Sequence, residues 1–283
     1  MNQLTSQERS AIVACLVEGT SLRATCRITG AAKKTVSRLA AELGAACQAH
    51  CDAAMVNLPC ADIQCDEIWA FVGAKQKNVK TQAQRDKQWG DVWTWIAIDR
   101  QTKLIPAWYI GDRSAQSAYH FMRLLQARLA NRVHLSTDGH HAYLTAVKAA
   151  FLAAPIDYGM LIKIYGDSAA GYSPADCIGA RREPILGTMT TDKICTSHAE
   201  RNNLTVRMSM RRFTRLTNAF SKSVEMHRLA CALHFTHYNF CRIHQTLRCT
   251  PAMAAGITDR VWEIADLVDL LDASKALPLP LAA

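Results

Sequence analysis

Residues 61–72 have the sequence ADIQCDEIWAFV, and their side chains alternate in the way that predicts a β-strand. Ile63, Cys65, Glu67, Trp69 and Phe71 share one face of this strand, whereas Asp66, Ile68, Ala70 and Val72 share the other. Because neighbouring side chains of a strand point in opposite directions, only one of the two adjacent acids can point into a site on a given face. We predict that Asp66 does so, with Glu67 as the alternative.

Further strands and helices follow this segment in a recognisable order. The pattern predicts strands at 92–99, 103–110, 133–137 and 158–164, with helices at about 114–130 and 142–151. Three strands, a helix, a strand, a helix and a strand are the order of the ribonuclease-H-like fold. We therefore predict an α/β catalytic core with a mixed five-stranded sheet flanked by helices.

The stretches after this core are less regular. Residues 166–193 contain Gly, Ser and Pro with little periodicity, which predicts an insertion or a flexible arm. The pattern from Ser197 to about Tyr238 is helical almost throughout.

The N-terminal residues predict a small all-α unit of three helices. Thr5 and Glu8 have the spacing of a capping box, Ser21 can cap a second helix, and Thr29-Gly30 makes a tight turn before the third. Such a turn before a helix that starts with basic and hydroxyl residues is typical of a helix-turn-helix. We predict that the third helix binds DNA through Lys33, Lys34, Ser37 and Arg38. The alternative is a plain three-helix bundle with a solvated face.

These patterns divide the chain into four parts. Residues 1–46 form the predicted helix-turn-helix domain. Residues 47–60, rich in Ala and Cys, form a linker that Pro59 closes, with a short helix within it as the alternative. The ribonuclease-H-like domain then covers residues 61–255, and residues 256–283 form an acidic helical tail.

Composition favours a polyanionic partner. The chain has 283 residues, of which 49% are hydrophobic, and its 33 Lys and Arg exceed its 24 Asp and Glu to give a net charge of +9. A positive charge strengthens binding to nucleic acid through phosphate contacts and counterion release. The chain shows no secretory signal and no apolar stretch long enough to span a bilayer, so we expect a cytoplasmic protein. Its eleven cysteines are then expected to be reduced rather than paired.

Three acids stand in settings that suggest a shared metal site. Asp66 lies within the first strand, Asp138 directly follows the strand at 133–137, and Glu200 falls in the first turn of a helix that begins near Ser197. Carboxylate oxygens are the ligands that Mg²⁺ prefers, and two such ions can stabilise both the attacking and the leaving oxygen of a phosphodiester. We therefore predict that Asp66, Asp138 and Glu200 are catalytic metal ligands. Asp138 capping the following helix is the alternative.

Basic and amide side chains follow Glu200 along the predicted helix. Asn203, Arg207 and Arg211 recur at helical spacing, and Arg201 lies close by. Because arginine binds phosphate oxygens, we predict that these four residues contact DNA. A solvated basic face is the alternative.

The motifs around these acids resemble those of one known family. Residues 66–73, DEIWAFVG, are similar to the opening motif of the insertion-sequence-one (IS1) family of bacterial DDE transposases, and Thr137-Asp138-Gly139 is similar to its second acidic motif. Residues 200–204, ERNNL, and 220–227, FSKSVEMH, resemble its third motif and the segment that follows. The resemblance runs in order from about residue 62 to 240.

This resemblance implies a DNA transposase that cleaves the ends of an insertion sequence and transfers the strands. It implies Asp66, Asp138 and Glu200 as the DDE triad, and Mg²⁺ as the cofactor, for which Mn²⁺ is expected to substitute. It further implies a homo-oligomer that binds terminal inverted repeats and target DNA. Two other functions stay open, namely a nuclease of the same fold without strand transfer, and a helix-turn-helix regulator with an inactive core.

Overall fold

The computed structural model describes residues 4–166, 176–214 and 217–276. The chain divides into two compact units, and three of the four boundaries between them fall inside a continuous strand or helix. The first unit contains Met1–Met55, Trp69–Asp91 and Thr205–Ala283, and the second contains Val56–Ile68 and Val92–Leu204. No helix in the described part of the chain is long and apolar enough to cross a membrane.

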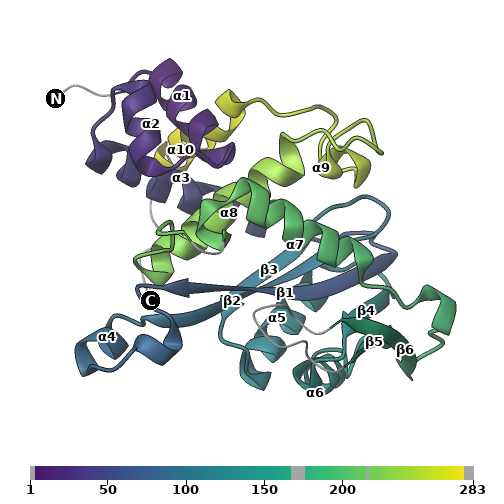
Figure 1. The fold of residues 1–283 in the computed structure, drawn as a ribbon. Helices are drawn as coiled ribbons and strands as arrows, with labels where there is room; N and C mark the ends of the chain where they lie inside the picture. Colours follow the sequence, from purple (N-terminus) through teal and green to yellow (C-terminus); the bar gives the residue numbers. More distant parts are fainter. Residues whose placement is uncertain (1–3, 167–175, 215–216, 277–283) are drawn as a thin grey trace. The chain divides into compact units, whose positions relative to one another are not determined.

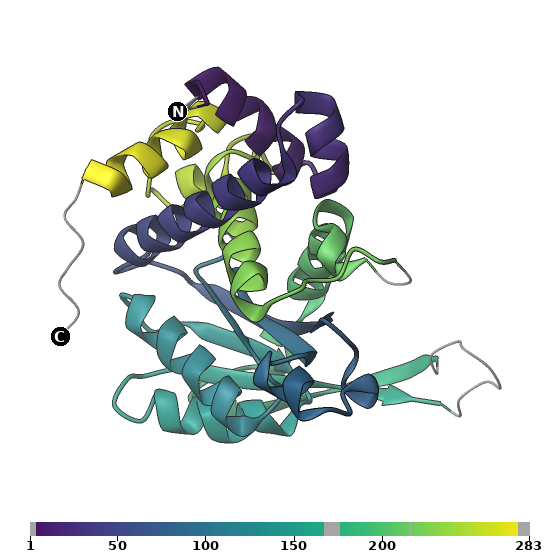
Figure 2. The same cartoon turned by 90° about the vertical axis from the view of Figure 1, so that its left-hand side faces the viewer.

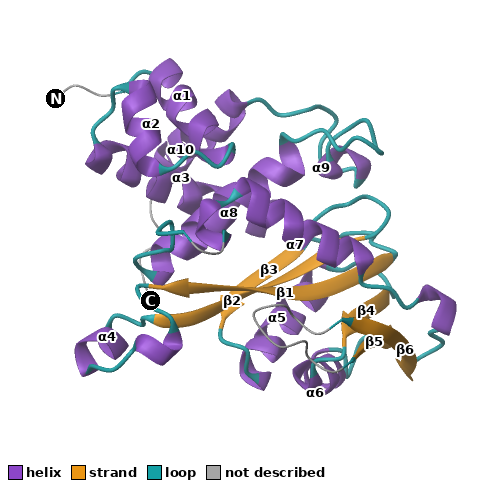
Figure 3. Ribbon diagram, in the orientation of Figure 1, coloured by secondary structure: helices purple, strands orange, loops and turns teal. Residues whose placement is uncertain are grey.

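A six-stranded mixed sheet has the order β3-β2-β1-β4-β5-β6 (Figures 1 and 3). The central strands β1, β4 and β5 are parallel neighbours, whereas the pairs β2/β3 and β5/β6 are antiparallel. The order of the first five strands is compatible with a ribonuclease-H-like core. The strands are β1 (Asp62–Val72), β2 (Gly90–Asp99), β3 (Ala107–Gly111), β4 (His134–Asp138), β5 (Asp157–Tyr165) and β6 (Cys177–Leu186).

The predicted five-stranded sheet is wrong by one strand. β6 lies within the residues 166–193 that were expected to form an insertion or arm, and it pairs with β5 from Tyr158↔Leu186 to Tyr165↔Cys177. Most of its side chains are exposed, so it lacks the hydrophobic alternation that reveals a half-buried strand. Figure 2 shows this hairpin extending away from the rest of the sheet. Residues 167–175 of this expected insertion or arm lie outside the described residues.

Helices α5 (Ala115–Arg128) and α6 (His141–Ala150) belong to the same unit as most of the sheet and connect successive strands. The buried side chains of α5 include Phe121, Met122 and Leu125, and those of α6 include Tyr143 and Val147. The ring of Tyr143 meets that of the fully buried Trp95 edge-on, at 5.2 Å between centroids. These contacts pack α6, which begins just after Asp138, against the sheet.

The first unit begins with the three predicted helices, α1 (Ser6–Val17), α2 (Leu22–Thr29) and α3 (Lys33–Ala54). Thr5 and Glu8 form the expected capping box, and the Ser21 side chain caps α2. Gly30 adopts φ +72°, the left-handed conformation that ends α2. The linker predicted from residue 47 is wrong in its first half, because α3 continues to Ala54 and buries Cys47 and Cys51.

Helix α3 continues because its second half packs within the first unit. It contacts α8 (Val224–Phe240) and α10 (Ile264–Ala276), and Cys51 in this half lies 3.2 Å from the Thr236 hydroxyl of α8. Helix α10 buries Leu267, Val268 and Leu271, and its Asp272 forms an ion pair of 2.7 Å with Arg9 of α1. The acidic tail therefore packs on the N-terminal helices.

The helix predicted over 197–238 is interrupted. Helix α7 (Ser197–Ser209) ends before a 3₁₀ turn, η3 (Arg211–Phe213), and α8 begins only at Val224. Within the interruption, Ser221 forms a parallel bridge with Val72 at the end of β1, and the Phe220 and Phe71 rings stack at 4.7 Å. Backbone pairing to a strand replaces helical hydrogen bonds here. The remaining short helical elements are η1 (Gln76–Asn78), α4 (Gln82–Asp86), η2 (Thr191–Lys193) and α9 (Pro251–Ala254).

Gly44 provides a test of the packing between α3 and α8. A Cβ atom at this position would lie 2.4 Å from the Leu229 carbonyl oxygen, whereas helix propensity alone favours Ala over Gly by about 1 kcal/mol. We expect Gly44→Ala to lower the free energy of unfolding by about 1–3 kcal/mol, because a close backbone contact must open. Denaturant unfolding followed by circular dichroism measures this change.

The adjacent Ala45 is exposed on the same helix and gives the matched control. Ala45→Gly should cost only the propensity difference of about 1 kcal/mol. A Gly44→Ala protein that is more stable than the wild type would contradict the close packing.

Candidate active site

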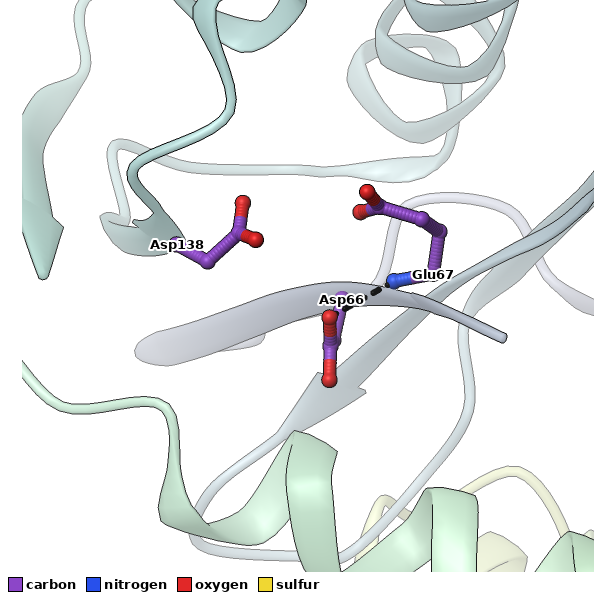
Figure 4. Close-up of side chains that lie close together, drawn as sticks. All are labelled: Asp66, Glu67 and Asp138. Atoms are coloured by element: carbon purple, nitrogen blue, oxygen red, sulfur yellow. Dashed lines mark hydrogen bonds between the residues drawn. The ribbon is translucent and has the colours of Figure 1, made fainter. Parts of the chain in front are cut away.

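Three carboxylates of the second unit meet where β1 and β4 lie side by side. The two strands are parallel, with Cys65 opposite Thr137, so the next residues, Asp66 and Asp138, come at neighbouring positions. Asp66, Glu67 and Asp138 each offer a carboxylate oxygen, and these three oxygens lie within 4.8 Å of one another. In Figure 4 the carboxylates of Glu67 and Asp138 face each other, while Asp66 leaves β1 on the other side. The predicted alternation of Asp66 and Glu67 is confirmed.

Glu67 points toward α6 and is paired with a cation. Its Oε1 atom accepts from Arg113, with 2.6 Å to Nη2, and its Oε2 atom accepts from the Tyr143 hydroxyl at 3.2 Å. The Glu67 side chain is only 1% exposed, so this pairing offsets much of the cost of burying its charge. Burial and the neighbouring Asp138 still raise the pKa of Glu67.

Asp66 has neutral hydrogen-bond partners instead. Its Oδ1 atom accepts from the Glu67 backbone N–H at 2.9 Å, and its Oδ2 atom accepts from the side-chain amide of Asn203 at 2.8 Å. Burial, together with the negative charges of Glu67 and Asp138, raises the pKa of Asp66 to about 7. Neither Asp66 nor Asp138 has an ion-pair partner among the described residues.

Glu200 lies in the first turn of α7, as predicted, but its carboxylate stands outside this cluster. Its Oε1 atom accepts from the Thr196 hydroxyl at 2.6 Å and pairs with Nζ of Lys163 on β5 at 2.8 Å. The negative charge of Glu200 nevertheless contributes to the raised pKa of Asp66. The structure thus brings two of the three predicted ligands together and holds the third nearby on a lysine.

The residues predicted to contact DNA differ in their surroundings. Lys33, Lys34 and Arg38 are exposed at the start of α3, with Ser37 half-buried, and Arg201 is exposed on α7. Arg207 is half-buried near the end of α7, whereas Arg211 lies beyond that helix in the 3₁₀ turn, contrary to the predicted helical spacing. Asn203 is also placed differently, because it is 6% exposed and its amide binds Asp66 rather than facing solvent.

Three partners of the acids, namely Arg113, Tyr143 and Lys163, were not predicted from the sequence. Arg113 precedes α5, Tyr143 lies in α6 and Lys163 lies on β5, so only the folded sheet brings them to Glu67 and Glu200. The one available signal was the position of Tyr143, in the first turns of the helix that follows Asp138.

Comparisons with known proteins agree with these motifs. A family model described as IS1 transposase matches residues 181–240, which include Glu200, α7 and α8. Protein InsB of insertion element iso-IS1n from Shigella dysenteriae is 27% identical over 162 residues, which cover 57% of this chain and 84% of that protein. The matched model and this relative confirm the predicted resemblance to the IS1 transposases.

Proposed function

We propose that the chain is a DDE transposase that cleaves DNA at the ends of an insertion sequence and joins the freed strands to target DNA. The observation that carries this proposal is the pair formed by Asp66 and Asp138. They lie on adjacent parallel strands within reach of one cation, and neither has a cationic side chain as a partner. Arg113 neutralises Glu67, so Asp66 is favoured over Glu67 as a ligand.

The donor set fits a hard divalent cation. Asp66 and Asp138 offer oxygen ligands, and the raised pKa of Asp66 reflects burial together with repulsion from Glu67 and Asp138, which a bound cation would offset. We propose that Asp66, Asp138 and Glu200 hold Mg²⁺, with Mn²⁺ as a substitute, and that Glu200 exchanges its contact with Lys163 in doing so. When bound, such ions would stabilise the charge that develops on the phosphodiester in cleavage and in strand transfer.

The chain's own residues would position the reacting groups. Asn203 and the Glu67 backbone N–H fix the Asp66 carboxylate, and Arg113 and Tyr143 bind the Glu67 carboxylate. Water then attacks a phosphodiester to free a 3′-OH, and this 3′-OH attacks a target phosphodiester with release of one target strand end. Both steps are displacements at phosphorus, so no covalent enzyme intermediate is required.

DNA is the proposed partner, both as terminal inverted repeats and as target. We propose that α2 and α3 act as a helix-turn-helix, with Lys33, Lys34, Ser37 and Arg38 as contacts. Arg201, Arg207 and Arg211 are proposed to contact the DNA backbone. A homo-oligomer in the bacterial cytoplasm would bring two element ends together.

Strand-transfer assays with the terminal-repeat DNA that flanks the reading frame test this function. Asp138→Asn keeps the size and polarity of the side chain but removes its charge. We expect strand transfer in Mg²⁺ to fall by about 10²–10³-fold or more, as when a group that stabilises transition-state charge is lost. DNA affinity, measured by fluorescence anisotropy, should stay unchanged.

Asp86 on α4 is exposed and gives a matched control, because Asp86→Asn makes the same chemical change away from the acid cluster. Retained strand transfer by Asp138→Asn would refute the assigned role. Cleaved but unjoined products from the wild type would favour the nuclease, and sequence-specific binding without metal-dependent cleavage would favour the regulator.

The raised pKa of Asp66 predicts a pH-dependent stability. The folded state binds this proton more tightly than the unfolded chain, so ionisation of Asp66 destabilises the fold as the pH rises from about 4 to about 7. Without divalent metal, we expect the wild type to lose stability relative to Asp66→Asn across this range. Thermal unfolding at a series of pH values measures the difference.

At pH 8, Mg²⁺ should make the wild type more stable than Asp66→Asn, because a cation that binds only the folded state raises its stability. A free Mg²⁺ concentration 100 times the Kd would add about 2.7 kcal/mol to the wild type. Asp66→Asn should gain much less. Equal Mg²⁺ stabilisation of both proteins would show that Asp66 is not a ligand.

A further inference from the structure

A cavity of about 660 Å³ lies within the first unit. Its walls come from the turn between α1 and α2, the start of α3, residues 209–212, residues 218–220 with Lys222, and one face of α8. Gly19 closes one side, because a Cβ atom there would lie 2.6 Å from the Ser209 carbonyl oxygen. The volume lies within the range of about 300–1,000 Å³ that is usual for small-molecule sites. A DNA duplex is too large for this space, but a single nucleotide is not.

The cavity is lined by positive charge without compensating acids. Arg23, Lys33, Arg211, Arg212 and Lys222 all line it, and none of the described lining residues is acidic. Arg212 donates to the Ser221 hydroxyl at 3.0 Å and forms no ion pair with a described carboxylate. Burial lowers the pKa of Arg212, which reflects the cost of holding a guanidinium away from water. An anion in the cavity would offset that cost.

A second, independent feature is an unpartnered imidazole in the cavity wall. His234 of α8 is 5% exposed, and both of its ring nitrogens are buried without a hydrogen-bond partner in the described structure. Such unpaired groups are costly and are usually satisfied by a ligand or an ordered water. A neutral imidazole offers one donor and one acceptor, which matches the edge of a nucleobase.

The rest of the lining is suited to a flat ring. Phe220 and Met226 line the cavity together with Leu22 and Leu233. The Lys222 ammonium lies 3.1 Å from the centroid of the Phe220 ring. Aromatic side chains with cations close by are the usual platform for an unstacked base, where stacking contributes about 1–3 kcal/mol per base.

We propose that this cavity binds one unpaired nucleotide of the DNA, with its phosphate on Arg23, Arg211 and Arg212 and its base between Phe220 and His234. The inference rests on the proposed DNA-binding function and deepens it, because it adds a site for a nucleotide that has left the duplex stack. Leaving the stack costs a few kcal/mol, least at a mismatch or a strand end. The site should therefore select DNA that is already unpaired.

The first experiment measures DNA affinity without divalent metal, so that the acid cluster plays no part. The full-length protein is titrated with a terminal-repeat duplex that carries one unpaired thymidine, and with the fully paired duplex. Arg23→Ala should weaken binding of the unpaired substrate by about tenfold and reduce the slope of log affinity against log salt by about one. The paired duplex should be affected less.

Arg27→Ala is the matched control, because Arg27 is exposed on the same helix and does not line the cavity. It should change the affinity for the unpaired substrate less than about twofold, as a charge outside the site is largely screened by salt. Equal losses from both variants would show general attraction to DNA and would overturn the nucleotide site.

The second experiment locates the base directly. The unpaired thymidine is replaced by 5-iodouracil, the complex is irradiated, and the crosslinked peptide is identified by mass spectrometry. We expect crosslinks at Phe220 or His234. These crosslinks should be lost in the Arg23→Ala protein at a protein concentration below its Kd for the DNA. Crosslinks only outside the cavity would overturn the proposal. Binding of free thymidine monophosphate in the cavity, together with DNA crosslinks only at other residues, would overturn it too.

These outcomes separate the nucleotide site from the proposed function. Crosslinks at Phe220 without strand transfer in Mg²⁺ would refute the transposase proposal and leave the nucleotide site standing. Strand transfer with crosslinks only elsewhere would refute the nucleotide site alone.

Discussion

Repulsion among three carboxylates at the adjacent strands β1 and β4 is the constraint on which the site depends. Asp66, Glu67 and Asp138 place oxygens within 4.8 Å of one another in a partly buried setting, where like charges cannot all ionise freely. The chain provides a cationic partner for only one of them, through Arg113 on Glu67. The negative charge of the other two carboxylates must be neutralised by a proton or by a cation. The pKa of Asp66, raised to about 7, indicates that it binds a proton readily. A fold that needed this cluster only for stability would be improved by replacing it with apolar side chains.

The alternation of β1 gives two neighbouring acids different roles. Asp66 faces α7, where Asn203 donates to it, and Glu67 faces α6, where Tyr143 donates to it. Because the period of a strand is two residues, a slip of one residue would exchange these faces and would put Asp66 on the arginine. The buried residues on either side, Ile63 and Ile68, resist such a slip. Hydrophobic packing along β1 therefore fixes which carboxylate stays free of a cation.

The sequence was sufficient to predict those elements in which local periodicity and burial agree. The alternation in β1, the strand that ends at Asp138 and the capping box at Thr5 all follow from side chains that are close together along the chain. Prediction from the sequence failed where contacts between residues far apart in the chain decide whether an element forms and where it ends. β6 is mostly exposed and exists through its pairing with β5, helix α3 is extended by packing on α8, and the break after Ser209 accompanies pairing of Ser221 with Val72. The direction of the Glu200 side chain depends on Lys163, which no local pattern could reveal.

Negative and positive side chains gather in different units, so that the proposed DNA binding and the proposed phosphodiester chemistry can depend on different residues. The acid cluster lies in the second unit, and the acid-free cavity with its unpaired arginine lies in the first. The acids repel a DNA phosphate until a cation is bound, so they cannot be the source of DNA affinity in the absence of metal. The basic lining of the cavity attracts phosphate whether or not metal is present. Under the proposed function, the chain would bind its DNA first and react only when the carboxylates are neutralised, because the two steps would depend on groups of opposite charge in different parts of the fold.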